Sequence, residues 1–371
     1  MCAKGGWTVI VRVDLGGRSY DIHIGSGTLG QAGRAVAAAG PGRRALLVAD
    51  GHVANSHAPL LASSLHAAGI TTQLVVVPPG ERSKSLDVAA RLYDACIDGG
   101  LDRSSWIVAV GGGVVGDLAG FVAATFLRGI PFVQVPTTLQ AQLDASVGGK
   151  VAVDHPRGKN LIGAFHQPRL VWCDVGTLAT LPRPELVAGM TEAIKHGVIA
   201  APAYYRFIRR RREALLGLEP KSMAWLVAGS CRIKAGVVAA DEREETGARA
   251  VLNLGHTLGH ALEAVAGYGT LRHGEAVAIG LVAAGRLARL RGTWSQRWQT
   301  ELEAVLTEYG LPTRIPGLPL SELLSVMRLD KKAQAGRLRW ILPQRPGSVV
   351  LVADVPLADV QAVLLALGAG A

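Results

Sequence analysis

The sequence is poor in cysteine, and its few cysteines are far apart. The four are Cys2, Cys96, Cys173 and Cys231, and no two form a C-x-x-C pair. This spacing excludes a disulfide framework and a cysteine zinc knuckle, and it favours a reducing, cytoplasmic location. No apolar run approaches the roughly 20 residues that cross a bilayer, and residues 1–10 lack the pattern of a signal peptide. We therefore expect no membrane partner and no secretion signal.

Aromatic residues are also scarce, at 5% of the chain, whereas glycine occurs 46 times. Much of the interior must then be alanine, valine and leucine, with tight turns where backbones approach closely. Hydrophobic residues make up 49% and charged residues 18% of the 371 positions, a globular balance that excludes a disordered chain. At roughly 100–200 residues per domain, the length indicates two domains built of layered helix and sheet.

Lysine accounts for only nine of the 39 basic residues. The net charge of +10 raises the hypothesis of a nucleic-acid binder, because Lys and Arg dominate the binding of phosphate backbones. The one dense basic run, Arg206 with residues 209–212, fits a solvated helix face better, so we predict no nucleic-acid partner. Seven lysines instead stand beside glycine, acidic or histidine segments, where a compact ammonium is of use. They are Lys84, Lys150, Lys159, Lys195, Lys234, Lys331 and Lys332.

The two halves of the chain differ in their hydrophobic patterns. The first half alternates helical stretches near 54–68, 86–98 and 115–127 with apolar strands at 8–13, 45–49, 72–77, 106–110, 132–135 and 170–173. This alternation predicts a Rossmann-like α/β domain around a buried parallel sheet over residues 1–182. Apolar residues at i, i+3 and i+4 then predict helices at 185–199 and 222–240, within a mainly α-helical domain over residues 183–371. We expect the functional site between the two halves.

A glycine-rich motif follows the strand expected at 106–110. Gly111, Gly113 and Gly116 satisfy G-x-G-x-x-G and open the next expected helix, where backbone amides can cradle a pyrophosphate. On this match alone, a glycine packing turn fits equally well. The acid that a standard Rossmann unit carries about 20 residues further on is missing. Asp50, at the end of another expected strand, can take the place of that acid and bind the ribose. Alternatively, Asp50 forms an Asx turn.

Carboxylate and imidazole groups gather in the second half. Glu192 and Lys195 lie three residues apart and so share a helix face, which by itself fits an ordinary surface ion pair. His256 and His260 have the i, i+4 spacing suited to metal coordination, and His273 follows. One histidine of this pair, together with His273 and Glu192, offers three ligands and leaves positions for substrate, as in a catalytic zinc site. The spacing leaves open which of His256 and His260 is the ligand, and a pair of core histidines is the alternative.

Isolated cations and amides stand near these motifs, and each one alone fits a surface charge. Because they group within Gly-rich segments beside candidate metal and nucleotide sites, they indicate a small polyanionic substrate that carries phosphate or carboxylate. These groups are Arg128, Lys150, Lys159 with Asn160, Lys234, Arg249, and Asp330 with Lys331 and Lys332.

From position 13 through 336 the chain resembles the 3-dehydroquinate synthase family of sugar phosphate cyclases. Several long motifs occur in the family's order, at 111–121, 144–150, 158–165, 192–195 and 253–260. The resemblance implies an NAD-dependent, zinc- or cobalt-containing lyase of the shikimate pathway. Such an enzyme converts 3-deoxy-D-arabino-heptulosonate 7-phosphate (DAHP) into 3-dehydroquinate and phosphate. Transient oxidation by NAD, β-elimination of phosphate, re-reduction, ring opening and intramolecular aldol closure would follow one another in one pocket.

The resemblance also implies roles for individual residues. Glu192, His256 and His273 would bind the metal, and His260 would contact substrate and relay a proton. The NAD site would be lined by Asp50, Glu81, Lys84, Gly112, Gly113, Val114, Asp117, Thr137, Thr138, Lys150, Lys159 and Thr180. Substrate would be surrounded by Asp144, Lys150, Asn160, Lys195, Lys234, Arg249, Asn253 and Lys332. Arg128 would reach into the neighbouring subunit of a homodimer.

Two alternatives stay beside this interpretation. One is another sugar phosphate cyclase, whose substrate lacks the carboxylate of DAHP, although Lys234, Arg249 and Asn253 favour a carboxylated substrate. The other is a metal-dependent polyol dehydrogenase of similar two-domain build, which would release NADH stoichiometrically. The chain also departs from the family's pattern, because Asp241 and Arg249 are eight positions apart instead of seven. The extension, at residues 244–246, bears on the direction in which Arg249 points.

Overall fold

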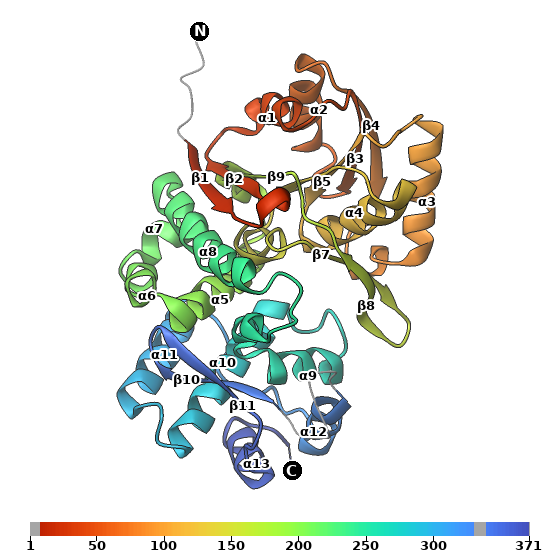
Figure 1. The fold of residues 1–371 in the computed structure, drawn as a ribbon. Coiled ribbons are helices and arrows are strands. Elements are labelled where there is room, and N and C mark those ends of the chain that lie inside the picture. Colours follow the sequence, from red (N-terminus) through yellow and green to blue (C-terminus); the bar gives the residue numbers. More distant parts are fainter. Residues whose placement is uncertain (1–7, 330–338, 371) are drawn as a thin grey trace. The chain divides into compact units, whose positions relative to one another are not determined.

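The computed structural model describes residues 8–329 and 339–370 (Figure 1). The chain divides into two compact units. The first comprises Met1–Leu181 with Leu218–Arg243, and the second comprises Pro182–Gly217 with Glu244–Ala371. We predicted a single boundary after residue 182. The chain does change units after Leu181, but residues 218–243 return to the first unit.

A seven-stranded sheet forms the centre of the first unit, in the order β1-β2-β9-β6-β5-β3-β4. Its strands are β1 (Thr8–Val13), β2 (Tyr20–Gly25), β3 (Arg44–Asp50), β4 (Thr71–Val77), β5 (Trp106–Gly111), β6 (Phe132–Pro136) and β9 (Leu170–Asp174). Strand β1 is antiparallel to β2, and all other neighbours are parallel. The predicted α/β class is confirmed, and the six expected strands end within one residue of their predicted bounds.

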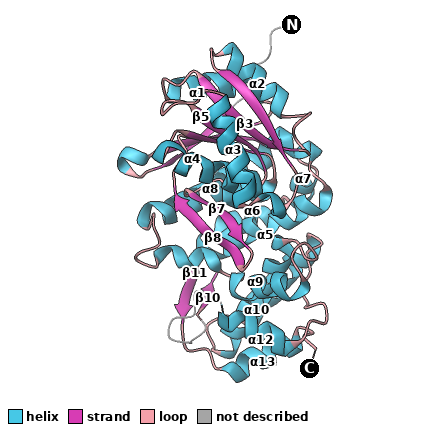
Figure 2. Cartoon of the chain, turned by 90° about the vertical axis from the view of Figure 1, so that its right-hand side faces the viewer, coloured by secondary structure: helices cyan, strands magenta, loops and turns pink. Residues whose placement is uncertain are grey.

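Helices cover both faces of this sheet, which explains why its central strands are apolar without interruption. They are α1 (Ala32–Ala39), α2 (Ala58–Ala67), α3 (Leu86–Asp98) and α4 (Gly113–Thr125), seen among the magenta strands in Figure 2. Successive side chains of a strand point to opposite faces. In β5, Ile107 therefore packs in one core with residues of α3 and α4, and Val108 packs in the other with residues of α1 and α2.

The order of the strands reverses direction at β3. The chain runs outward from β3 to β4, then crosses to the other side of β3 to form β5, and continues through β6 to β9. The carboxyl ends of β3 and β5 therefore flank a topological switch point, where open α/β sheets bind their ligands. Asp50 ends β3 and Gly111 ends β5. Two nucleotide-binding signals of the sequence thus lie at the ends of neighbouring strands.

Helix α8 (Pro220–Ala240) packs against β1 and β2, which explains why residues 218–243 belong to the first unit. By length and composition α8 is also apolar enough to cross a membrane, which our survey of apolar runs did not anticipate. However, 56% of its apolar window is buried inside the protein. The core helix of a globular domain has the same composition, and the packing of α8 on the sheet is that of a core helix.

Three strands of the first unit were not predicted. The sequence of β2 alternates polar and apolar residues over Tyr20–His23, because one face of the strand is less buried than the other there. Strands β7 (Lys150–His155) and β8 (Gly158–Phe165) form a separate antiparallel hairpin, and β7 packs on α4. This hairpin carries three predicted site residues, Lys150, Lys159 and Asn160.

The second unit is mainly helical, as predicted, with one hairpin of β10 (Trp340–Arg345) and β11 (Ser348–Val352). Its helices are α5 (Arg183–Ala200), α6 (Pro202–Arg210), α7 (Arg212–Leu216), α9 (His256–Ala266), α10 (His273–Leu290), α11 (Gln296–Glu308), α12 (Leu320–Leu329) and α13 (Leu357–Ala366). Helix α5 is buried almost continuously from Leu186 to Ile199. It carries Glu192 and Lys195.

Glycine contacts bring α5, α9 and α10 close together. A Cβ atom on Gly280 of α10 would lie 1.9 Å from the carbonyl oxygen of Gly255, which caps α9. A Cβ atom on Gly274, also in α10, would lie 1.9 Å from the carbonyl oxygen of Ala188 in α5. Only glycine permits such close approach. These contacts hold together the three helices that carry the predicted metal ligands.

Candidate active site

The glycine turn after β5 has the geometry of a phosphate-binding turn. Helix α4 begins at Gly113 with Gly112 as its N-cap, so the backbone N–H groups of its first turn face the end of the sheet. A Cβ atom on Gly116 would lie 2.5 Å from Oε1 of Gln134 on β6. Gly116 therefore permits close packing of helix and sheet. Gly111 and Gly113, the first two glycines of the motif, form the turn, as in a dinucleotide-binding fingerprint.

Asp50 occupies the carboxyl end of β3, beside that turn in the sheet order. Its Oδ1 atom accepts a hydrogen bond of 2.9 Å from the backbone N–H of His52. The Asx turn considered from the sequence is therefore present. A carboxylate accepts several hydrogen bonds, so the turn leaves Asp50 able to accept others from a ribose hydroxyl.

The predicted threonines follow the next strands of the sheet. Thr137 and Thr138 follow β6, and the backbone N–H of Thr137 donates to the carbonyl oxygen of Gly111 at 2.9 Å. Thr180 ends the 3-10 turn Val175–Thr180 that follows β9, and its hydroxyl lies 2.9 Å from Nε2 of His57. These residues therefore gather at the carboxyl edge of the sheet, where the glycine turn also lies.

Lys84 joins residues from three segments of the first unit. Its Nζ atom lies 2.5 Å from Oδ2 of Asp117 on α4, and it also donates a hydrogen bond to Oδ1 of Asn160 on β8. Nearby, Nζ of Lys159 lies 3.7 Å from Oε2 of Glu81. Burial alone would lower the pKa of Lys84, which is 4% exposed, but Asp117 raises that pKa above its ordinary value. The structure thus brings five predicted residues into one charged cluster.

Asp144 and Lys234 form a second ion pair in this unit. Asp144 lies in a π-helical turn, Ala141–Ala145, and Nζ of Lys234 on α8 lies 2.6 Å from its Oδ1 and 2.7 Å from its carbonyl oxygen. Turns of π-helix are rare and are frequent at functional sites. Both residues were predicted to contact substrate, and the structure places them side by side.

Arg128 and Lys150 are exposed, each at the end of a different element. Arg128 has a φ of 68° and the preceding Leu127 a φ of 49°, both in the left-handed region that non-glycine residues rarely adopt. Two consecutive residues of this kind store backbone strain, which is common at functional sites. Lys150 begins β7.

In the second unit, Glu192 is buried in α5 with Lys195 against it. Nζ of Lys195 forms an ion pair with Oε2 of Glu192, and both side chains are 1% exposed, so this is no surface pair. Burial alone would raise the pKa of Glu192, but the Lys195 ammonium and two imidazoles hold it well below its ordinary value.

His256 and His273 both direct Nε2 toward the same oxygen of Glu192. The distance to Oε1 is 3.9 Å from His256 and 3.6 Å from His273. Each ring is held through its other nitrogen, since Nδ1 of His256 lies 3.2 Å from the carbonyl oxygen of Leu254 and Nδ1 of His273 lies 3.0 Å from Oε2 of Glu263. The three ligand atoms lie within 4.8 Å of one another.

This arrangement fits a divalent cation. Bond lengths of about 2.0–2.1 Å in a tetrahedral site place two ligand atoms about 3.3 Å apart, which is close to the separations found here. Burial and the Lys195 ammonium hold the pKa of His256 well below its ordinary value, so its imidazole is neutral, as a ligand must be. Burial opposes protonation of His273, but Glu192 and Glu263 raise its pKa to about 9. A positive charge is therefore favoured between these carboxylates.

Three further predicted residues of this unit, His260, Asn253 and Arg249, lie around the three ligands or close to them in sequence. The ring of His260 is 5.3 Å from that of His256 and 6.0 Å from that of His273, measured between centroids. Asn253 ends the 3-10 turn before α9. Arg249 is 2% exposed, and its Nε lies 3.6 Å from Oε1 of Glu244, which belongs to the one-residue extension. Lys332, also predicted, lies outside the described residues.

The sequence interpretation missed Glu263. It follows His256 by seven residues and His260 by three, a spacing that places all three on one face of α9. That spacing was a usable signal, but an acid in a helix is too common to be singled out without its partner. The structure supplies the partner, His273.

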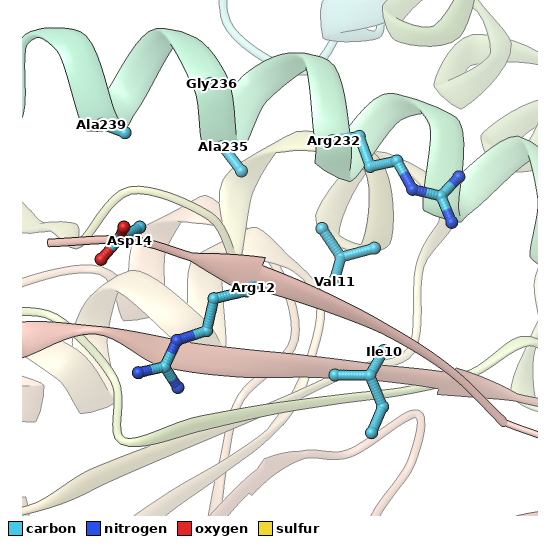
Figure 3. Close-up of a pocket in the computed structure, with 8 residues that line it drawn as sticks. All are labelled: Ile10, Val11, Arg12, Asp14, Arg232, Ala235, Gly236 and Ala239. Atoms are coloured by element: carbon cyan, nitrogen blue, oxygen red, sulfur yellow. The ribbon is translucent and has the colours of Figure 1, made fainter.

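A separate cavity of about 350 Å³ lies between β1 and α8 (Figure 3). Its lining includes Arg12 and Asp14 from the strand segment and Arg232 with Ala235 from the helix. None of its lining residues was predicted to bind metal, NAD or substrate.

Comparison with known proteins decides the family. The model named 3-dehydroquinate synthase N-terminal matches residues 74–188, and the model named 3-dehydroquinate synthase C-terminal matches residues 189–333. The chain belongs to the 3-dehydroquinate synthase family. A 3-dehydroquinate synthase from Desulforamulus reducens is 48% identical over 355 residues, which cover 95% of this chain and 99% of that protein. The resemblance drawn from the motifs is confirmed.

Solved structures related to the 3-dehydroquinate synthase family share the fold of the whole chain. The 2-epi-5-epi-valiolone synthase of Streptomyces hygroscopicus, solved with NAD+ and Zn²⁺, is 27% identical with a TM-score of 0.87, covering 97% of this chain and 99% of its own. A 2-deoxy-scyllo-inosose synthase, solved with carbaglucose-6-phosphate, NAD+ and Co²⁺, is 25% identical with a TM-score of 0.88, covering 96% and 99%. Both were solved with NAD+ and a divalent metal ion.

Proposed function

We propose that this chain converts DAHP into 3-dehydroquinate and inorganic phosphate. The observation that carries the proposal is the extent of the family match, because 48% identity spans nearly the whole of both chains. The cyclases with other substrates are only 25% and 27% identical. The proposed substrate also fits the chemistry of the chain, since a phosphorylated and carboxylated sugar needs several fixed cations.

NAD and a divalent ion, Zn²⁺ or Co²⁺, are the proposed cofactors. NAD supplies reversible hydride transfer, and the ion supplies a positive charge that acidifies a substrate hydroxyl. Glu192, His256 and His273 would hold the ion, supported by the common direction of their ligand atoms. The NAD site would be formed by Asp50, Glu81, Lys84, the turn of Gly112, Gly113 and Val114, Asp117, Thr137, Thr138, Lys150, Lys159 and Thr180.

The substrate would be held by the remaining charged and amide groups. Cations placed in fixed positions stabilise the charge that develops on the departing phosphate, and a closed site keeps the unstable intermediates from escaping. We assign this role to Arg128, Asp144, Lys150, Asn160, Lys195, Lys234, Arg249, Asn253 and Lys332, with His260 relaying a proton. The buried ion pairs of Lys195 and Lys234 support the assignment, because pairs of this kind hold a side chain in one position.

We further propose a cytoplasmic homodimer in which Arg128 completes the site of the neighbouring subunit. The support for this role is the position of Arg128, which is exposed on a strained turn of this subunit. An arginine of an active site is expected to contact a carboxylate or the substrate, and the neighbouring subunit would provide that contact.

The decisive experiment measures phosphate release from DAHP by the protein loaded with NAD and Co²⁺ or Zn²⁺. Chelation or removal of NAD should abolish release, and adding each back should restore it. His260→Ala should lower kcat by about 100-fold or more, the usual effect of losing a general acid or base, and Lys195→Ala should abolish release. Accumulation of NADH would instead identify a polyol dehydrogenase. Equal turnover of heptulose or hexose phosphates without the carboxylate would identify a different cyclase.

A further inference from the structure

Glu263 is a buried acid whose position suggests a specific task. It lies in α9, is 8% exposed, and places Oε2 3.0 Å from Nδ1 of His273 at the start of α10. A buried carboxylate is costly to keep unless it is paired and hydrogen-bonded. The contact with His273 joins Glu263 to the three-ligand cluster without making it a ligand of that cluster.

The contact determines which nitrogen of His273 keeps its proton when the ring is neutral. An ionised carboxylate only accepts hydrogen bonds, so Nδ1 must be the donor. Nε2 then faces Glu192 Oε1 at 3.6 Å with its lone pair available when the ring is neutral. In metal sites a carboxylate on the far nitrogen fixes the tautomer and the ring plane, and it strengthens the imidazole as a ligand.

The charge balance of the cluster gives Glu263 a second effect. Lys195 lies against Glu192, so the ammonium offsets the negative charge of the only anionic ligand in the set. His256 is held by a neutral backbone carbonyl, that of Leu254, and gains no charge from it. Glu263 therefore supplies a second negative charge beside the ligands, and that charge favours a divalent cation at short range.

We propose that Glu263 is a positioning residue that orients His273 and raises the affinity of the cluster for a divalent cation. The inference rests on the proposed function only in taking Glu192, His256 and His273 as the metal ligands. The proposal gives Glu263 no bond to the ion or the substrate, and its effect passes through the hydrogen bond with His273.

The test compares Glu263→Gln and Glu263→Leu with the unchanged protein. Glutamine has nearly the same shape and still accepts a hydrogen bond from Nδ1, but it lacks the charge. Leucine lacks both. The matched control is Glu303→Gln, because Glu303 is also a partly buried acid that contacts α10, through Arg286 at 3.1 Å.

Metal-free protein is titrated with Co²⁺ in the presence of a competing chelator, and binding is followed by the visible absorption of the bound ion. We expect the affinity to fall by about 10-fold to 100-fold in the leucine variant and by less in the glutamine variant. The Glu303→Gln control should bind as the unchanged protein does. The absorption spectrum should also change in the leucine variant, because the His273 ring is no longer held.

Equal Co²⁺ affinity in the unchanged protein and both Glu263 variants would overturn the inference. A loss of Co²⁺ affinity in Glu303→Gln as large as that in the Glu263 variants would also overturn it. Glu263→Gln is nearly isosteric, so it decides the question even if the leucine variant does not fold. The titration contains no DAHP. Failure of the unchanged protein to release phosphate would therefore overturn the proposed function and leave this comparison readable.

Discussion

Nζ of Lys84 lies 2.5 Å from Oδ2 of Asp117, although 33 residues separate them in sequence. The Lys84 side chain is 5% exposed and that of Asp117 21% exposed. The pair joins the segment after β4 to the first turns of α4, where the glycine turn begins. It therefore contributes to the stability of the first unit as well as to the charge of the proposed NAD site.

Replacing Lys84 by methionine should destabilise the protein by about 3 kcal/mol, the lower end of the cost of leaving one partner of a buried pair unpaired. The reason is that the Asp117 carboxylate, whose pKa burial already raises above its ordinary value, loses the cation that opposes this effect. Urea unfolding followed by circular dichroism measures the change. Lys84→Met with Asp117→Asn should recover part of the loss.

The exposed Lys221 provides the control for this change. Lys221→Met should alter the free energy of unfolding by no more than about 0.5 kcal/mol, as surface substitutions usually do. If Lys84→Met proves as mild as Lys221→Met, the pair does not stabilise the fold.

The contact between Gly280 and Gly255 predicts a different kind of loss. In Gly280→Ala the new methyl group would meet the Gly255 carbonyl oxygen at 1.9 Å, so α9 and α10 must move apart. Overpacking of this kind costs about 1–3 kcal/mol or more, and it displaces His256 from His273. We expect a lower midpoint of urea unfolding together with weaker Co²⁺ binding.

Gly236→Ala is the matched control, because a Cβ atom there has no heavy atom within 4 Å and the residue lies inside α8. It should stabilise the protein by up to about 1 kcal/mol and leave Co²⁺ binding unchanged. Unaltered stability and metal binding in Gly280→Ala would show that the two helices are not held by this contact.

Much of the first unit could be predicted from sequence because its signals are local. Uninterrupted apolar runs marked β3 and β5, and the glycines after β5 marked the turn. Strand β2 was missed because its alternating residues, Tyr20–Gly25, resemble many surface segments. The β7–β8 hairpin was missed because the segment that forms β8, Gly158–Phe165, was interpreted by the chemistry of its residues instead of by its backbone shape.

The metal cluster could be predicted only in part, for a physical reason. Helical spacing places His256 and His260 on one face, but it does not tell which of them lies nearer Glu192 on another helix. That choice depends on the approach of α5, α9 and α10, which the carbonyl contacts of Gly274 and Gly280 set. The role of Glu263 depends on the same approach, since its partner is on α10.

The ion pair of Arg18 with Glu242 predicts a pH-dependent contribution to stability. Arg18 donates to both carboxylate oxygens of Glu242, at 3.1 and 2.7 Å, and Gln167 donates to one of them at 3.0 Å. The hydrogen bond from Arg18 lowers the pKa of Glu242 below its ordinary value of 4.5. A carboxyl group whose pKa is lowered by folding stabilises the folded state above its unfolded pKa, and this stabilisation is lost as the pH falls through the folded pKa.

Glu242→Gln should therefore be less stable than the unchanged protein at pH 7, and the difference should shrink below about pH 4.5. Urea unfolding at a series of pH values measures it. Arg18→Gln removes the same pair and should give the same pH profile. A difference that stays constant from pH 7 to pH 3 would mean that the ion pair is not its cause.

The proposed role of Arg128 makes a prediction about mixed dimers. Arg128→Ala and His260→Ala should each lower phosphate release, the first through the neighbour's site and the second through its own. If the two variants are mixed and allowed to exchange subunits, half of the dimers become hybrids. In each hybrid one site has an intact His260 and receives an intact Arg128 from the partner subunit, so about a quarter of all sites should recover activity.

If Arg128 acts within its own subunit, both sites of the hybrid carry a defect and mixing restores nothing. Measuring phosphate release before and after exchange, with light scattering to confirm the dimer, separates these outcomes, and a monomer would contradict the proposal directly.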